Sequence, residues 1–257
     1  MTRPPVKNYS FQKRAQQVGF TLVELMVALV ISLFILGAVL STYLSMKKTF
    51  NLQDNLAQLQ DSQRLALTML TTTIQSSGYF VNPLSDTSFS ALPAATVTRI
   101  DNSSSAFTAG QAVVGTGDGS GSDGDSDTIA VRYQTANGDG LMNCQGASNT
   151  SGASAISTNS FSINASNELA CTVNNGSSVE LASNVGKMSI LYGVDTDGDG
   201  SIDAYMPASG VTAATLWNAV YTAQISLRFL DTTSSKPGAL VLMPKPVVQT
   251  INFMNRQ

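Results

Sequence analysis

The stretch that decides the fold is FTLVELMVALVISLFILGAVL, Phe20 to Leu40, in which Thr21, Glu24 and Ser32 are the only polar side chains. These 21 residues would form roughly 31 Å of α-helix, which is enough to cross the hydrocarbon core of a bilayer. We therefore expect an apolar, membrane-spanning helix near the start of this 257-residue chain.

The charges on either side of the apolar run are unequal. Residues 1–19 contain four bases and no acid, whereas the remaining 238 residues hold the other ten bases and all 17 acids. Because positive flanks stay on the cytoplasmic side, we expect a cytoplasmic N-terminus and a chain that lies outside the cytoplasm after Leu40. The overall net charge of −3 argues against a basic nucleic-acid-binding face.

Glu24 needs an explanation that two common kinds of N-terminus do not give. A cleaved secretory signal has an apolar region of about 7–15 residues, shorter than this one. A simple signal-anchor helix fits the length and the basic flank, but a carboxylate inside it costs about 3 kcal/mol on insertion scales. Glu24 therefore either lies at the level of the cytoplasmic headgroups or has a partner.

The hexapeptide GFTLVE at residues 19–24, after a short basic leader and before an apolar helix, resembles the class III signal of type IV prepilins. The resemblance implies that prepilin peptidase cleaves between Gly19 and Phe20, and that the new N-terminus at Phe20 is methylated. It also implies that Glu24, then the fifth residue, pairs with the N-terminal amine of a neighbouring subunit. A buried ion pair is tolerable where either lone charge is not.

The helix is expected to continue beyond the membrane. Residues 44–77 contain no Pro or Gly, and a stripe with three- or four-residue spacing runs through Leu52, Leu56, Leu59, Gln63, Ala66, Leu70 and Ile74. Gly78 and Pro83 mark its end. The sequence thus predicts a leader at 1–19, a long helix at 20–78 with a transmembrane segment at 20–40, and a globular head at 79–257.

The head has the composition of short strands separated by polar loops. We expect strands at 127–133, 161–163, 169–173, 179–181, 188–192, 222–229 and 247–253. Residues 101–126 are interpreted as a flexible loop, and 134–160 have only a weak pattern. One long helix followed by a run of strands predicts an α+β fold of the type IV pilin kind, with the helix packed on an antiparallel β-sheet head.

Cys144 and Cys171 are the only cysteines and fall in the exported part, where disulfides persist. A disulfide across this spacing would contribute about 3 kcal/mol in the loop-entropy model. Two unpaired buried thiols are the alternative. A redox-active pair is not expected, because the C-x-x-C spacing is missing.

Residues 195–203, DTDGDGSID, match the first positions of an EF-hand calcium loop. The candidate Ca²⁺ ligands are Asp195, Asp197, Asp199, Ser201 and Asp203, and Gly200 permits the sharp turn. Met206 stands where an EF-hand has its bidentate Glu, so the loop is EF-hand-like only, and an Asx-rich turn without metal is the alternative. Asp123, Asp125 and Asp127 repeat the spacing but lack the Gly, and we interpret them as a solvated loop.

Short blocks in the head are similar to PilW-type minor pilins. They are Gly78-Tyr79-Phe80, SDTIAVRY at 126–133, Tyr192-Gly193-Val194, the cysteine pair and Asn255-Arg256. The resemblance implies a minor pilin of the type IV pilus that joins other minor pilins and the major pilin, primes assembly and lies at the pilus tip beneath a tip adhesin. It would reside in the inner membrane with a periplasmic head before moving to the filament at the cell surface. The J-type pseudopilin of type II secretion, of similar architecture, is the alternative.

Two further classes of function fit the residues less well. The chain has no His, which removes histidine bases, His-based triads and His-containing zinc sites. We expect no catalytic residues, and no cofactor other than the candidate Ca²⁺. A membrane-anchored ectodomain would explain the anchor and the head, but it would leave Gly19 and Glu24 without a role.

Overall fold

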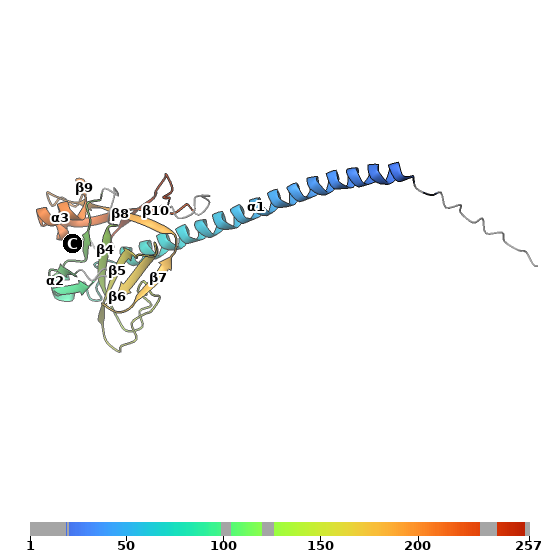
Figure 1. The fold of residues 1–257 in the computed structure, drawn as a ribbon. Coiled ribbons are helices and arrows are strands. Elements are labelled where there is room, and N and C mark those ends of the chain that lie inside the picture. Colours follow the sequence, from blue (N-terminus) through green and yellow to red (C-terminus); the bar gives the residue numbers. More distant parts are fainter. Residues whose placement is uncertain (1–18, 20, 99–103, 120–125, 232–240, 255–257) are drawn as a thin grey trace, which may run out of the picture. The chain divides into compact units, whose positions relative to one another are not determined.

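The computed structural model describes Gly19 and residues 21–98, 104–119, 126–231 and 241–254 (Figure 1). Phe20 and the Asn255-Arg256 pair lie outside these residues. The chain divides into two compact units, Met1–Gln53 and Asp54–Gln257, and each is described by itself.

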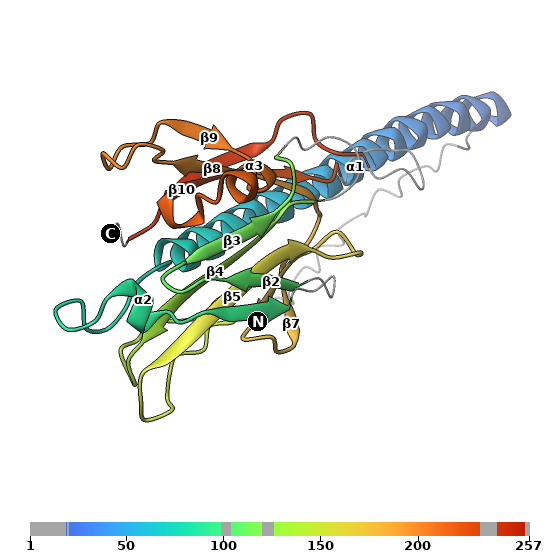
Figure 2. The same cartoon turned by 90° about the vertical axis from the view of Figure 1, so that its left-hand side faces the viewer.

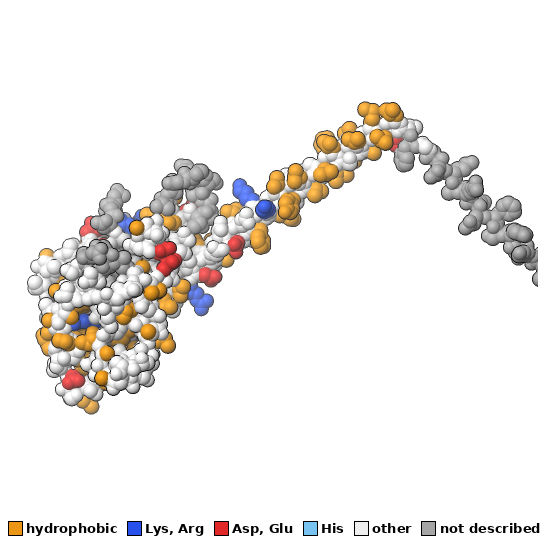
Figure 3. All heavy atoms as spheres, turned by 60° about the horizontal axis from the view of Figure 1, so that its bottom comes forward, with side chains coloured by type: hydrophobic (Ala, Val, Ile, Leu, Met, Phe, Trp, Pro, Cys, Tyr) orange, Lys and Arg blue, Asp and Glu red, His pale blue; other side chains and the backbone are white. Residues whose placement is uncertain are grey.

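The first unit contains the start of helix α1, which spans Leu22–Gln75. Thr21 caps the helix, since its hydroxyl oxygen accepts a hydrogen bond from the N–H of Glu24 at 3.3 Å. The side chains from Leu22 to Phe50 are exposed and mostly apolar (Figure 3). The hydroxyls of Ser32, Thr42 and Thr49 donate to carbonyls three or four residues earlier, so even these polar atoms are satisfied within the helix.

The second unit contains the rest of α1, and here the predicted stripe is confirmed in part. Leu59 is 5% exposed, Gln63 is half-buried, and Ala66, Leu70 and Ile74 are fully inaccessible. Leu52 and Leu56, in contrast, are 40% and 49% exposed. The helix ends at Gln75, and Gly78 adopts a φ of +79°, a left-handed conformation typical of helix ends. The packing stripe is therefore shorter than the sequence predicts.

A five-stranded antiparallel sheet forms one part of the head, in the order β3-β4-β5-β6-β7. Its strands are β3 (Val113–Thr116), β4 (Thr128–Thr135), β5 (Ala155–Ile163), β6 (Leu169–Val173) and β7 (Ser178–Ala182). Successive strands are neighbours throughout, so the sheet is a simple meander.

A four-stranded antiparallel sheet, in the order β11-β10-β8-β9, forms a second part. Its strands are β8 (Val185–Val194), β9 (Ala204–Met206), β10 (Val220–Phe229) and β11 (Val247–Asn252). The predicted strand at 222–229 is present as β10, on which Ala223, Ile225, Leu227 and Phe229 are buried. Their neighbours Gln224, Ser226 and Arg228 are half-buried.

Smaller elements complete the described part of the head. The hairpin of β1 (Ala95–Thr98) and β2 (Ser104–Phe107) is a separate two-stranded sheet. Helix α2 (Ser88–Ala91) lies between α1 and β1, while helix α3 (Ala208–Ala214) and the 3-10 turn η1 (Trp217–Ala219) lie between β9 and β10.

The structure corrects the two loop assignments made from composition. Strands β2 and β3 lie inside residues 101–126, and β5 begins at Ala155 rather than at 161. In β5 the expected alternation is hidden, because Ser157, Asn159, Ser160 and Ser162 are buried polar residues. A strand covered on both faces need not alternate apolar with polar side chains.

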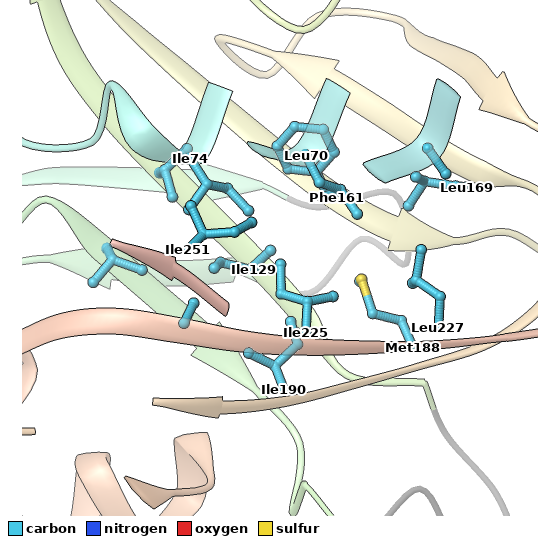
Figure 4. Packing of buried hydrophobic residues seen from close by; sticks show 14 of the residues in the cluster. Leu70, Ile74, Ile129, Phe161, Leu169, Met188, Ile190, Ile225, Leu227 and Ile251 are labelled. Atoms are coloured by element: carbon cyan, nitrogen blue, oxygen red, sulfur yellow. The ribbon is translucent and has the colours of Figure 1, made fainter. Parts of the chain in front are cut away.

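Both sheets share one hydrophobic core with the C-terminal part of α1 (Figure 2). Leu70 and Ile74 of the helix lie in the same cluster as Phe161 of the five-stranded sheet and Ile225 of the four-stranded sheet (Figure 4). The α+β class predicted from the sequence is thus confirmed, with two antiparallel sheets rather than one packed on the helix.

Arg132 on β4 connects the five-stranded sheet to the segments that flank the β1–β2 hairpin. It is 1% exposed, and its guanidinium donates to the carbonyls of Leu92, Pro93, Thr108 and Gln111. The guanidinium carbon also lies 4.6 Å from the centre of the Phe107 ring. Burial lowers the pKa of Arg132 to about 10, so the group remains charged at neutral pH. One buried cation therefore ties the segments on both sides of the hairpin to the sheet.

The Leu70→Ala substitution tests the shared core. It should lower the free energy of unfolding by about 2–5 kcal/mol, because it leaves a cavity where the helix meets both sheets. Urea unfolding of the detergent-solubilised chain, followed by circular dichroism, measures the change. Leu65→Ala, on the same helix at a 45% exposed position, is the matched control and should change it by about 0.5 kcal/mol or less. Equal effects of the two substitutions would contradict this description of the core.

Candidate functional site

The first candidate site is the start of α1. Gly19 is exposed, Phe20 lies outside the described residues, and Glu24 is an exposed acid in the first helical turn. A carboxylate at this place is stabilised by the positive end of the helix dipole. Among the described residues, α1 is long and apolar enough to span a membrane, with a mean hydropathy of 2.7 over its most apolar window and no burial there. Helix and motif together indicate anchoring in the inner membrane.

The second candidate site is the loop between β8 and β9. Carboxylate oxygens of Asp195, Asp197 and Asp203 lie within 4.8 Å of one another. Asp195 is 3% exposed, while Asp197 and Asp203 are exposed. Asp199 stands outside this group, and its Oδ1 accepts from the N–H of Ser201 at 2.7 Å. The structure thus brings together three of the four predicted carboxylates.

Backbone donors give the loop its curl. Asp195 Oδ1 accepts from the N–H of Gly198 at 2.6 Å, and its Oδ2 accepts from the N–H of Gly200 at 2.8 Å. Both glycines have a left-handed φ, +81° and +85°. Across the mouth of the loop, Asp203 Oδ2 accepts from the N–H and the hydroxyl of Thr196, each at 2.7 Å.

These hydrogen bonds favour the ionised forms of the Asp195 and Asp203 carboxylates. For Asp203, the backbone N–H and the hydroxyl of Thr196 lower the pKa. For Asp195, desolvation acts to raise the pKa, but the N–H groups of Gly200 and Gly198 outweigh it, and the pKa is lowered. Ionised oxygen ligands on a curled loop are what a hard cation such as Ca²⁺ requires, so the three carboxylates fit a metal ion.

Asp127 differs from its prediction as a residue of a solvated loop. It is 3% exposed, and its Oδ2 accepts from the N–H of Ile190 at 2.7 Å. Its own N–H donates to the carbonyl of Met188 at 2.9 Å, so Asp127 joins β4 to β8. Desolvation raises its pKa, partly offset by the Ile190 hydrogen bond. Asp123 and Asp125 lie outside the described residues.

Cys144 and Cys171 form the predicted disulfide, with their Cα atoms 6.3 Å apart. Both residues are buried, at 1% and 0% exposure. Cys171 lies on β6, and the N–H of Cys144 donates to Asn159 Oδ1 on β5 at 2.9 Å. The bond therefore fixes the long β4–β5 connection to the five-stranded sheet.

Two family models match the chain. Residues 148–238 match the family described as type IV pilus-assembly protein W, PilW, and residues 14–40 match the prokaryotic N-terminal methylation motif. Comparisons with curated proteins and with solved structures found no match. The two family matches confirm the resemblance to PilW-like type IV pilins that the hexapeptide and the head predict.

Sequence reasoning missed Arg132 and the burial of Asp127 as structural residues. Both fall within the SDTIAVRY block that resembles PilW-type pilins, but a charged residue in a single sequence carries no sign of its backbone partners. Identifying them requires the tertiary structure, in which the start of β4 contacts β8 and Arg132 contacts the segment after the hairpin.

Loss of the disulfide should destabilise the head. The Cys144→Ala/Cys171→Ala double variant is expected to lose about 2–4 kcal/mol of unfolding free energy, because its unfolded state is no longer constrained. Chemical denaturation of the detergent-solubilised chain, with and without reductant, measures this loss. Reductant should destabilise the native chain and leave the double variant unchanged. A native chain that is indifferent to reductant would contradict the expectation.

Proposed function

We propose that this chain, a PilW-like type IV pilin, is a minor pilin that prepilin peptidase processes and that takes part in priming pilus assembly and in the tip complex. The observation that carries the proposal is the prepilin motif at the start of a helix whose apolar, membrane-length segment is exposed, in a chain whose residues 148–238 match PilW. PilW pilins are structural proteins, so the proposed role is mechanical.

In this proposal, cleavage after Gly19 leaves a cationic amine on Phe20, and methylation keeps it basic. Glu24 then pairs with the corresponding amine of a neighbouring pilin. The pairing would fix the axial offset between subunits, because two buried opposite charges tolerate only a narrow range of positions.

The exposed apolar residues of α1 support this route. A single helix of this kind is stable in lipid, and it is also stable in a bundle of similar helices. Transfer from lipid to bundle gains chiefly packing and pairing energy, since both environments are apolar. The internal hydroxyl–carbonyl bonds of Ser32, Thr42 and Thr49 lower the polar cost in either place.

We further propose that Asp195, Asp197 and Asp203 hold a Ca²⁺ ion that stiffens the turn between β8 and β9. The ion would be structural, and its removal would loosen the loop without altering the core. Asp199 and Ser201 would then act through the backbone conformation of the loop and not through direct ligation.

The Glu24→Gln substitution tests the assembly role. In a deletion strain complemented with this variant, the protein should remain processed and membrane-resident, while piliation falls by about tenfold or more, since the N-terminal amine loses its counter-charge. Surface pili counted by electron microscopy and the processed chain detected in membranes are the two measurements.

Glu180→Gln provides the matched control, because Glu180 is an exposed acid on the edge strand β7. It should leave piliation unchanged. Normal piliation with Glu24→Gln would refute the pairing.

Mass analysis of the N-terminal peptide should find methylated Phe20, and an uncleaved chain would refute processing. A deletion strain that keeps its pili but loses protein secretion would identify a secretion pseudopilin instead.

The calcium proposal predicts a ligand-dependent melting temperature. At 10 mM Ca²⁺, an extracellular-type affinity of about 0.1 mM would raise the Tm by roughly 5–10 °C over the chelated protein. Asp203→Asn should abolish this rise, whereas Asp61→Asn, at an exposed position on α1, should retain it. A Tm that is the same with calcium and with chelator would overturn the site.

A further inference from the structure

A groove of about 510 Å³ lies in the head beside the hairpin β1–β2. Val114 and Thr116 of β3 line it together with residues of β2, of α3 and of η1. The volume is within the range of small-ligand sites in proteins, about 300–1,000 Å³. Neither the pilin helix nor the aspartate loop takes part in it.

The groove has a mixed lining, in which Ala106, Val114 and Trp217 supply apolar surface and the other side chains are polar but uncharged. Six of them carry hydroxyls: Ser104, Ser105, Thr108, Thr116, Thr212 and Thr215. Asn218 adds an exposed carboxamide, whereas that of Gln111 is buried and already bonded to Thr108 and to the carbonyl of Val113. None of the described lining residues is acidic or basic. Hydroxyls and carboxamides both donate and accept hydrogen bonds. Such a surface matches an uncharged ligand that itself carries many hydroxyls, and it offers no counter-charge to an ion.

Trp217 adds an aromatic surface to this polar wall. It is the only tryptophan of the chain, it is half-buried, and it lines the groove. Its ring meets the Tyr192 ring edge to face, with centroids 5.0 Å apart and an interplanar angle of 75°. Its Nε1 donates to Thr212 Oγ1 at 3.0 Å. Both contacts hold the indole in place before any ligand arrives, which reduces the entropy lost on binding.

We propose that this groove binds a neutral oligosaccharide. The indole of Trp217 receives the apolar C–H face of a pyranose ring, and the Asn218 carboxamide binds the equatorial hydroxyls of the sugar. The hydroxyls of Thr108, Thr212 and Thr215 donate within the chain and act as acceptors toward the sugar. Asn218 is central to recognition, because it is exposed, lies next to the indole and presents both a donor and an acceptor. The site is independent of the proposed assembly role, so either proposal can fail without the other.

The single tryptophan makes binding directly observable. The full chain, solubilised in a zwitterionic detergent without a sugar headgroup, is titrated with neutral trisaccharides of glucose, galactose and N-acetylglucosamine. At least one should produce a saturable change in Trp217 emission with half-saturation at about 1 mM or below. No saturable response to any of the three at about 10 mM would overturn the proposal.

Variants separate groove binding from a general effect on the fold. Asn218→Ala should weaken binding by about tenfold, because a hydrogen-bonded carboxamide is lost, and it should leave the Tm unchanged. Asn252→Ala, at an exposed position on β11 outside the groove, should bind as the native chain does. Equal binding by both variants, or an equally strong response to neutral trialanine, would refute an oligosaccharide site.

Discussion

The packing of one short stripe of α1 against two sheets is the constraint on which the head depends. Ala66, Leu70 and Ile74 are inaccessible, and strands from both sheets contribute to the same cluster. These turns keep exposed positions such as Leu65, but their buried side chains share one cluster with both sheets, so the position of the helix fixes both sheets. The earlier part of the same helix buries no side chain, and its apolar surface has to be satisfied by lipid or by other chains.

Buried charges in the head are satisfied by backbone groups. Arg132 donates to four carbonyls around the base of the hairpin, and Asp127 accepts from a backbone N–H of β8. Backbone partners are fixed by strand register, so such contacts specify one arrangement of segments in a head with few charged residues. This explains how a domain rich in Ser, Thr and Asn forms a unique fold with only 12% charged residues.

The sequence predicts the helix, strands such as β4, β10 and β11, and the disulfide well, because each has a clear signal in the residues themselves. The run Phe20–Leu40, the alternation on β10 and the Cys144–Cys171 spacing are of this kind. It predicts β2, β3 and β5 poorly, since short or doubly covered strands of Ser, Gly and Asn carry no periodicity.

The groove could not be predicted from the sequence for a different reason. Ser105 and Trp217 are far apart in the chain, and only the fold brings both to the groove. The aspartate loop could be predicted in part. The spacing of its aspartates is visible in the sequence, but the conformation of the turn decides that Asp199 stands apart from Asp195, Asp197 and Asp203.

Asp127 and Asp195 in the head differ from Glu24 on the helix in the hydrogen-bond partners of their carboxylates. Asp127 and Asp195 accept hydrogen bonds from backbone N–H groups of their own chain, which stabilise the folded head. No side-chain partner of Glu24 is present among the described residues, and the helical residues that follow it are apolar, which favours a compensating cation from a neighbouring chain in the proposed assembly. In an apolar bundle the available cation is an N-terminal amine, and cleavage after Gly19 is the step that would supply it. Under the proposed function, cleavage at the processing site and the Glu24 carboxylate would supply the two charges of one ion pair.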